Sequence, residues 1–393
     1  MQLLIKNGLI LQNNGLLLRG HITAEQGKIS ALMYGEVPPL YADGEVLDAE
    51  DLIVCPGFVD THNHGGNGFG YTGEEGEWEK IQERLSATGV TSLTPTRESA
   101  TLDDTLKFID RISALMKKND SAKVDILGIH LEGPYLNANR KGMHQERFIR
   151  TASRKEIDCI LDRGNGIVKI WSMAPEIDEN RSVIKLLADA GVSVSIAHTD
   201  ADYETALAAF SAGATRVTHT FNTMPALHQR YQGIVTAAWQ HGAFMELIAD
   251  GHHISPTIIR MLVAASDPGK IVLVTDNNEC SGLPEGSYTI HGRPLIIEGT
   301  QLKCESGILA GSVAGLNQCA LTVSRCGFSA GLAIKTAAEN PARSVGAFDR
   351  KGSIEIGKDA DLVIVNGQFE VMTTVKGGRI VYRKYAANQT KKP

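Results

Sequence analysis

The sequence is poor in cysteine, in aromatic residues and in net charge, and it lacks long hydrophobic runs. Six cysteines are spread over 393 residues without a Cys-x-x-Cys pair, which argues against a disulfide framework and predicts free thiols in a reducing compartment. The formal net charge is -6 at pH 7, and the aromatic residues (6%) do not interleave with basic ones, so nucleic acid and anionic membranes are poor partners. Without a run of about 18 apolar residues or a signal-type N-terminus, the chain is predicted to be globular and cytoplasmic.

Both ends of the chain read as short strands separated by turns, with no helical segments between them. Leu3–Ile10 near the start and Ala360–Val365 near the end are examples. Neither end alone has enough strands to bury a sheet face, so we expect residues 1–54 and 352–387 to form one small β-sandwich domain. Residues 388–393 are expected to be a polar tail.

The central part, residues 55–351, alternates between apolar runs of strand length and amphipathic helical segments. The expected strands are Leu52–Asp60, Val90–Thr96, Val124–Glu132, Ile167–Pro175, Val192–His198, Thr215–Thr220, Phe244–Asp250 and Ile271–Thr275. The helices expected between them are Glu77–Ala87, Leu102–Lys117, Ser153–Leu161, Ser182–Ala190, Tyr203–Phe210, Ile234–His241 and Pro256–Ala264. This alternation predicts an α/β protein with a (β/α)8 TIM-type barrel, in which metal-dependent catalysis would take place.

An open doubly wound sheet is the alternative to the barrel. It would place a glycine-rich phosphate-binding turn after an early strand, with a helix starting at that turn. The glycine-rich segment Gly65–Gly70 follows two histidines, and no helical pattern begins at it. The barrel is therefore the favoured fold.

Ligand-type residues lie at the carboxyl ends of the expected strands, which is where barrel enzymes carry their chemistry. They are His62 and His64 on strand one, Glu132 on strand three, His198 on strand five, His219 on strand six and Asp276 on strand eight. Taken singly, each is more often an ordinary hydrogen-bonded residue than a ligand. Together at one rim they predict one or two divalent transition-metal ions, zinc or iron, with a glutamate able to bridge two ions. His130 and Asp60 lie one layer lower on their strands and are expected to support these ligands.

The sequence resembles a known family at these positions. The segment Pro56–His64, the β region split between the termini and the ligands on strands five, six and eight resemble the amidohydrolase superfamily. Within it, nearly the whole chain resembles the N-acetylglucosamine-6-phosphate deacetylases. The blocks that carry this likeness are His130–Asn137, Lys141–His144, Ala197–Thr199, Thr218–Pro225 and Leu273–Asp276.

The resemblance implies a role for each matching residue. Glu132, His198 and His219 would bind the main metal, and His62 and His64 would share Glu132 at a second site. Asp276 would be the catalytic acid and base. The remaining implied contacts are to the substrate: His144 and His253 with the sugar and its acyl carbonyl, and Asn222, the Thr223 backbone and Arg230 with the phosphate.

The implied reaction is hydrolysis of N-acetylglucosamine 6-phosphate to glucosamine 6-phosphate and acetate in amino-sugar catabolism. The resemblance also implies a homodimer in which each Arg230 reaches the pocket of the neighbouring subunit. This chain has Arg230–Gly233 where the family usually reads Arg-Glu-Pro-Gly, and it also departs at Gly65–Thr72 and Asn277–Cys280. These departures leave N-acetylgalactosamine 6-phosphate open as the substrate.

Two other functions remain as alternatives. An amidohydrolase that acts on a cyclic amide, of the dihydroorotase or hydantoinase type, would bridge its metals with a modified lysine at the end of strand four, whereas Lys169 lies near the start of that strand. A non-catalytic binding barrel is the more remote alternative, because every ligand position is filled.

Overall fold

The computed structural model of the chain describes residues 2–35, 44–73, 76–118, 123–177 and 180–384. The predicted tail, 388–393, and residues 385–387 of the predicted sandwich lie outside the described residues.

Eight parallel strands form a nearly closed barrel in chain order. They are β6 (Phe58–Asn63), β9 (Val90–Glu98), β11 (Ile129–Glu132), β12 (Val168–Met173), β13 (Ser193–Ile196), β14 (Ala214–Val217), β15 (Phe244–Leu247) and β16 (Ile271–Leu273). The short β10 (Asp125–Ile126) pairs with β9. The ring closes where the Asp276 N–H donates to the His62 carbonyl over 2.9 Å and Asn63 bridges Asn277. This consecutive order confirms the predicted barrel and excludes the doubly wound sheet.

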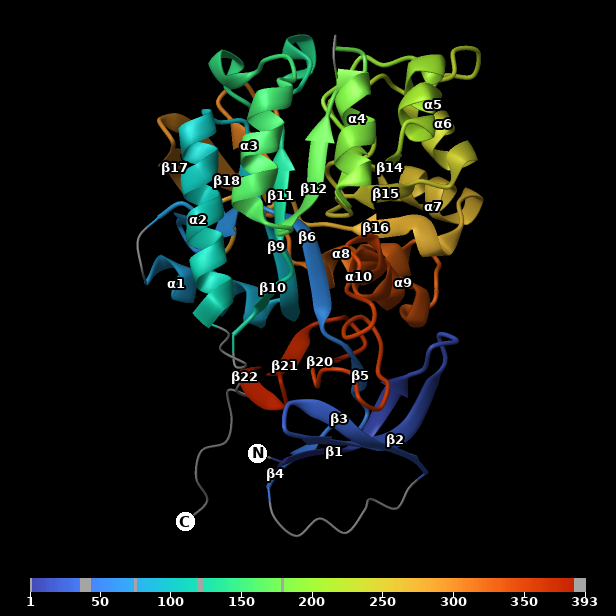
Figure 1. Cartoon of the computed structure of the whole chain (residues 1–393). Coiled ribbons are helices and arrows are strands. Elements are labelled where there is room, and N and C mark those ends of the chain that lie inside the picture. Colours follow the sequence, from blue (N-terminus) through green and yellow to red (C-terminus); the bar gives the residue numbers. More distant parts are fainter. Residues whose placement is uncertain (1, 36–43, 74–75, 119–122, 178–179, 385–393) are drawn as a thin grey trace.

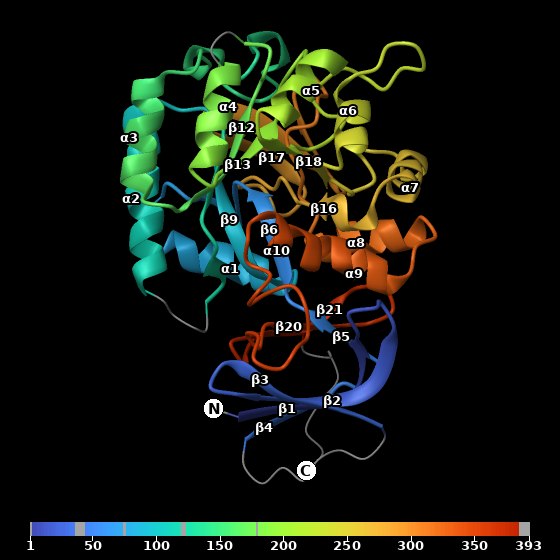
Figure 2. The ribbon, with the colours of Figure 1, turned by 45° about the vertical axis from the view of Figure 1, so that its right-hand side comes forward.

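Helices surround the barrel (Figures 1 and 2). They are α1 (Glu77–Ala87), α2 (Leu102–Lys118), α3 (Arg154–Gly164), α4 (Asn180–Asp189), α5 (Tyr203–Ser211), α6 (Ile234–His241) and α7 (Pro256–Ala265), followed by α8 (Leu316–Arg325), α9 (Ala330–Ala337) and α10 (Glu339–Ser344). In α2 the buried residues are Thr105, Phe108, Ile109 and Ile112, one face of a 3.6-residue period. Ser153, Asp202, Ser255 and Ser329 cap α3, α5, α7 and α9 with their side chains.

Strands from both termini form a second sheet beneath the barrel (Figure 1). Its members are β1 (Gln2–Leu11), β2 (Leu17–Glu25), β3 (Lys28–Tyr34), β4 (Glu45–Asp48), β5 (Ile53–Pro56), β20 (Leu362–Val365), β21 (Val371–Lys376) and β22 (Arg379–Arg383). The order is β22-β21-β20-β5-β1-β2-β3, so β5 joins the carboxyl-terminal strands to the amino-terminal ones. Side chains from both halves share one apolar core that includes Leu3, Ile22 and Leu362. The pairing of the two termini is therefore confirmed, while the exact division of the chain into domains stays a prediction.

The single strand expected over Leu52–Asp60 is wrong. The structure divides it into β5, which belongs to the terminal sheet, and β6, which belongs to the barrel. Gly57 separates the two, and a Cβ there would lie 2.1 Å from Thr91 Oγ1. A side chain would collide with Thr91, so the close approach at this crossing point requires glycine.

A small antiparallel sheet, β17 (Gly286–Ile290), β18 (Arg293–Glu298) and β19 (Gln301–Cys304), follows the last barrel strand. It stands over the rim on the side away from the terminal sheet, the side toward which the arrows of β11 and β12 point in Figure 1. Short elements complete the chain: β7 (Gly65–Gly66), β8 (Phe69–Gly70) and single 3-10 turns at Ala138–Arg140, Glu146–Phe148 and Pro268–Lys270. No helix in the described ranges has the length and hydrophobicity that a bilayer crossing requires.

Candidate metal centre and active site

His198, His219 and Glu132 form a compact triangle of ligand atoms at the barrel rim. The two Nε2 atoms lie 3.2 Å apart, and they lie 3.3 and 3.1 Å from Glu132 Oε1. A tetrahedral zinc ion with bonds of about 2.0–2.1 Å holds its ligands about 3.3 Å from one another. The three edges therefore have the length of one face of a metal tetrahedron.

A second group of ligand atoms lies on the other side of the same carboxylate. His62 Nε2 and His64 Nε2 are 3.2 Å apart, and they lie 3.5 Å from Glu132 Oε1 and 3.3 Å from Glu132 Oε2, respectively. Asp276 Oδ1 lies 3.4 Å from both imidazoles. The donor set, imidazole and carboxylate on both sides of one glutamate, fits one or two divalent transition-metal ions.

The hydrogen bonds at the far nitrogens assign the tautomers of two of these histidines, His62 and His198. His62 Nδ1 faces a carboxylate oxygen of Glu246 at 3.0 Å, and His198 Nδ1 faces the Arg140 carbonyl at 2.8 Å. Both Nδ1 atoms must donate, which leaves the Nε2 lone pairs free for a metal.

His144 has the opposite arrangement. Its Nε2 lies 3.3 Å from Glu132 Oε2, close enough to count as a metal ligand by distance alone. However, its Nδ1 accepts the Ser99 N–H over 3.2 Å, so the neutral ring carries its proton on Nε2. His144 is therefore arranged to donate a hydrogen bond into the pocket.

Burial and neighbouring charges shift the pKa values of the ligand residues. Burial lowers the pKa of His198 to about 4, so His198 offers a lone pair at neutral pH. Burial also disfavours a charge on His64, but hydrogen bonds to Asp276 and Glu132 raise its pKa to about 9. Burial opposes ionisation of Glu132, yet His62 and His144 hold its pKa well below the usual range. A cation that entered this centre would replace the His64 proton.

The backbone is strained at the ligand positions. His198, His219 and Asp276, which follow β13, β14 and β16, have positive φ angles of 44°, 28° and 49°. Left-handed conformations cost non-glycine residues about 1–3 kcal/mol each. Each strand thus turns abruptly at its ligand, and this turn directs the side chain across the rim.

The sequence analysis missed Glu246 and Arg216, which lie beneath the centre. Both are fully buried on adjacent strands β15 and β14. Arg216 Nε donates to Glu246 Oε1 over 2.7 Å, while Glu246 Oε2 accepts from the His62 ring and from the His219 backbone N–H at 3.1 Å. The sequence did carry a signal for them, since each is a charged residue within an otherwise apolar strand. Charged residues are almost never buried without a partner, so two of them on neighbouring strands indicate a buried pair.

The two residues expected to support the ligands behave differently. His130 packs its ring edge-on against His62, with centroids 4.6 Å apart, and its Nε2 pairs with Ser172 Oγ at 2.7 Å. Asp60 contacts no ligand imidazole: Thr275 Oγ1 donates to it over 2.6 Å and Asn63 Nδ2 over 3.1 Å. Asp60 therefore joins the first barrel strand to the last, and burial raises its pKa to about 6.

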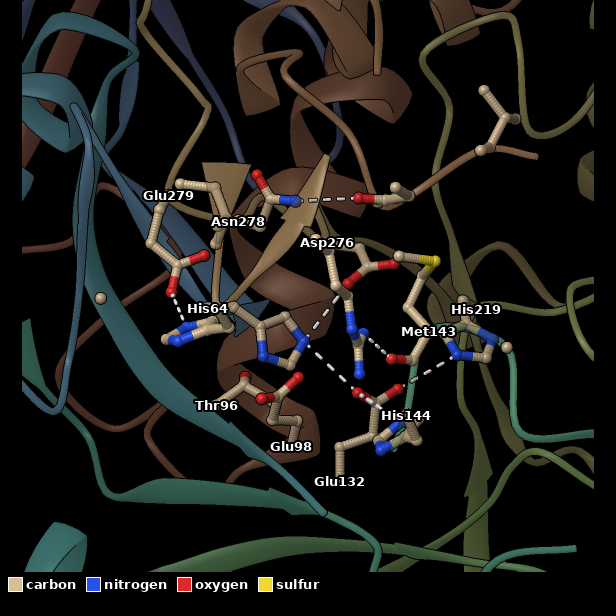
Figure 3. A pocket seen from close by; sticks show the side chains of 18 of the residues that line it. His64, Thr96, Glu98, Glu132, Met143, His144, His219, Asp276, Asn278 and Glu279 are labelled. Atoms are coloured by element: carbon tan, nitrogen blue, oxygen red, sulfur yellow. Dashed lines mark hydrogen bonds and ion pairs between the residues drawn. The ribbon is translucent and has the colours of Figure 1, made fainter. Parts of the chain in front are cut away.

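A cavity of about 410 Å³ opens onto this centre (Figure 3). The predicted residues that line it are His64, Glu132, His144, His198, His219, Asn222, Thr223, His253 and Asp276, and His62 lies just beneath. His253 is oriented by Asp250, which accepts from its Nδ1 over 2.7 Å and which the sequence analysis also missed. Neither Arg230 nor Lys169 lines the cavity. Arg230 is exposed, and its backbone N–H donates to His228 Nδ1 over 3.1 Å.

Comparison with known proteins identifies the family to which the chain belongs. Residues 53–381 match the amidohydrolase family. The chain belongs to the amidohydrolase family. Like other members, this amidohydrolase is a hydrolase of amide bonds, and the family uses divalent metal ions.

Its relatives include deacetylases of phosphorylated amino sugars. The N-acetylglucosamine-6-phosphate deacetylase of Bacillus subtilis is 32% identical over 395 residues, covering 98% of this chain and 99% of the relative. The N-acetylgalactosamine-6-phosphate deacetylase of Escherichia coli is 30% identical, with 90% and 93% covered. A solved structure from Mycobacterium smegmatis, a mutant deacetylase in complex with N-acetyl-D-glucosamine-6-phosphate, is 31% identical with a TM-score of 0.88, covering 97% of this chain and 99% of that one. These likenesses confirm the family resemblance read from the motifs.

Proposed function

We propose that this amidohydrolase cleaves the N-acetyl amide of an N-acetylhexosamine 6-phosphate, with N-acetylglucosamine 6-phosphate as the first candidate. The observation that carries the proposal is the cluster of candidate ligands on both sides of Glu132, beside the carboxylate of Asp276, in a chain related over almost its full length to such deacetylases. The products are the hexosamine 6-phosphate and acetate.

Glu132, His198 and His219 would hold the main metal ion, and His62 and His64 would hold a second one with Glu132. Zinc and iron both suit this donor set. The ion held by these residues would lower the pKa of a bound water to near neutrality and polarise a carbonyl group. Elemental analysis tests the assignment: His198→Ala should lose the main ion, and His62→Ala only part of the metal. Undiminished metal in His198→Ala would contradict it.

Two side chains would handle the proton and the developing charge. Burial opposes ionisation of Asp276, but His62 and His64 lower its pKa, so it is an acceptor at neutral pH. It would take a proton from the attacking water and pass it to the leaving amine. His144, with its proton on Nε2, would donate to the acyl oxygen as negative charge grows there.

The phosphate end would lie at Asn222 and the Thr223 backbone, on the opposite side of the cavity from β9. In the structure the Asn222 Nδ2 donates to the His219 carbonyl over 3.0 Å, so the amide is held in place beside the centre. Arg230 does not reach its own cavity, and the adjacent Tyr231 is 74% exposed. We therefore propose a homodimer in which Arg230 completes the phosphate site of the second copy.

An acetate-release assay tests the function. Metal-loaded protein would be given N-acetylglucosamine 6-phosphate, its galactose epimer and unphosphorylated N-acetylglucosamine. The glucosamine compound should be hydrolysed best and the unphosphorylated sugar poorly. The galactosamine epimer is the second candidate, because a relative that is 30% identical carries that name. Absence of acetate from all three substrates would refute the proposal.

A further inference from the structure

Glu176 stands within a hydrogen-bond network that surrounds the candidate ligand His198. It follows β12, and in the barrel β12 lies between β11 and β13. The loop after β11 carries Asn137 and Arg140, and His198 itself follows β13. Glu176 is half-buried and does not line the cavity. Any effect of this carboxylate on the site must therefore pass through the neighbouring loops and not through a contact with substrate.

On one side Glu176 holds the backbone that follows His198. Its Oε1 accepts the Asp200 N–H over 2.7 Å, and its Oε2 accepts the Thr199 hydroxyl. The same hydroxyl accepts the Ala201 N–H over 2.9 Å, so the turn after His198 is fixed at three consecutive residues. The chain needs support here, because His198 has a φ of 44°, in the left-handed region that non-glycine residues keep only where the surrounding structure constrains them.

On the other side Glu176 holds Asn137. Asn137 Nδ2 donates to Glu176 Oε1 over 2.8 Å, and the Asn137 backbone N–H donates to the His198 carbonyl over 3.0 Å. The side-chain oxygen of Asn137 accepts the Asn139 N–H over 2.9 Å and so caps the 3-10 turn that ends at Arg140. The Arg140 carbonyl accepts from His198 Nδ1 over 2.8 Å. Asn137 therefore places the carbonyl that orients the His198 ring.

Both sides of the network act on one imidazole. One side fixes the backbone of His198, the other fixes its ring, and Glu176 is the group that they share. We propose that Glu176 is a positioning residue for the main metal site, formed by Glu132, His198 and His219. It holds His198 in the strained conformation that directs Nε2 toward the other ligand atoms. The inference rests on the proposed function, because that function assigns a divalent metal ion to this site.

The second metal site, formed by His62, His64 and Glu132, has a different support. The His62 ring takes its orientation from Glu246, which lies on β15. Loss of the Glu176 carboxylate should therefore weaken the main site alone. A general loosening of the barrel would weaken both sites, and this difference separates a positioning role from a purely structural one.

Zinc binding, measured by titration against a competing chelator, tests the inference without any substrate. His62→Ala protein, which should keep only the main ion, is the background. Adding Glu176→Ala removes all three hydrogen bonds and should lower the zinc affinity by about 10- to 100-fold, the usual loss when a group that orients a ligand is removed. Adding Glu176→Gln should lower it less, because glutamine keeps an oxygen for the Asn137 and Asp200 donors.

A milder change covers the case in which Glu176→Ala does not fold. Thr199→Val keeps the shape of the side chain and the Glu176 carboxylate but removes the hydroxyl between Glu176 and the Ala201 N–H. One hydrogen bond of ordinary strength corresponds to a change of about three- to tenfold, and the zinc affinity of the main site should fall by that factor.

A second background shows whether Glu176 acts through His198. In His198→Ala protein, which should keep only the second ion, Glu176→Ala should change the zinc affinity by less than about threefold, since the group on which it acts is already absent. Glu146→Ala is the control in both backgrounds. It removes an exposed carboxylate that pairs with Lys141 on the loop after β11, and it should leave both affinities unchanged.

The outcomes separate the inference from the function on which it rests. A main-site affinity that stays within about threefold in Glu176→Ala, or in Thr199→Val if the former does not fold, would overturn the role of Glu176. An equal loss in the two backgrounds would also overturn it, because that result indicates a general loosening of the fold. Absence of zinc binding from the unmodified protein would overturn the metal centre and with it the proposed function.

Discussion

The buried arrangement of Arg216, Glu246 and His62 offers a test of how the metal centre is held. Glu246→Gln keeps the size of the side chain and removes its charge. Arg216 is fully buried and would lose its 2.7 Å partner. Leaving one member of a buried ion pair without its partner typically costs about 3–5 kcal/mol of unfolding free energy.

The same change also acts on the metal. Glutamine can offer its NH2 group to His62 Nδ1, which favours the tautomer with the proton on Nε2 and removes that nitrogen as a ligand. Replacing a carboxylate that orients a ligand histidine lowers metal affinity by about 10- to 100-fold. We expect the metal affinity to fall at the His62 and His64 site. The affinity of the His198 and His219 site should change less.

Two measurements check the expectation. Urea unfolding of metal-free protein gives the stability difference, and titration against a competing chelator gives the affinity of each ion. Glu204→Gln, an exposed change on α5, is the control and should stay within about 0.5 kcal/mol of the unmodified protein. The double variant Glu246→Leu with Arg216→Met should be less destabilised than the sum of its single changes, because neither charge is then left alone.

The reasoning would be refuted by a Glu246→Gln protein whose metal-free stability falls by less than about 1 kcal/mol and whose two affinities are unchanged. A stability loss without any change in affinity would also refute the positioning role, since a purely structural ion pair predicts that result.

Three further predictions follow from the site and the fold. Asp276→Asn should keep its fold and most of its metal but lower kcat by about a hundredfold or more; near-normal turnover would remove Asp276 from the proton transfer. Arg230→Ala should lower kcat/KM for the phosphorylated sugar by about ten- to hundredfold, and mixing it with Asp276→Asn protein should restore activity in hybrid dimers; no recovery despite proven subunit exchange would exclude donation between subunits. Burial opposes ionisation of Asp359, but Lys28 and Lys351 lower its pKa to about 2, so its contribution to stability is present above the unfolded pKa of about 3.9 and is lost as pH falls toward 2. Lys351→Met should flatten the stability profile between about pH 4 and 2, measured by urea unfolding, and an unchanged slope would contradict the assignment.

The barrel, and the meeting of the candidate site residues at one rim, could be predicted from the sequence because their signals are local. Strand and helix periods, the glycine and polar breaks between them, and the position of a histidine at the end of an apolar run are all read within about ten residues. Barrel closure then requires that strand ends meet at one rim, which is why His64, Glu132, His198, His219 and Asp276 come together as expected.

Other features depended on which distant side chains meet, and only the tertiary structure decided them. The run Leu52–Asp60 looks like one strand, but its first half pairs with β1 and β20 of the terminal sheet and its second half with β9 of the barrel. Asp60 has the period of a ligand support, yet it accepts hydrogen bonds from Thr275, Asn63 and the His62 backbone N–H and not from a ligand imidazole.

The buried network beneath the centre shows the same limit. The pairing of Arg216 with Glu246 and the tautomer of His62 depend on hydrogen bonds between strands that are far apart in the sequence. Local periodicity thus determined the scaffold and the positions of the candidate ligand residues, whereas burial and long-range pairing decided the protonation of these residues and the buried network that supports them.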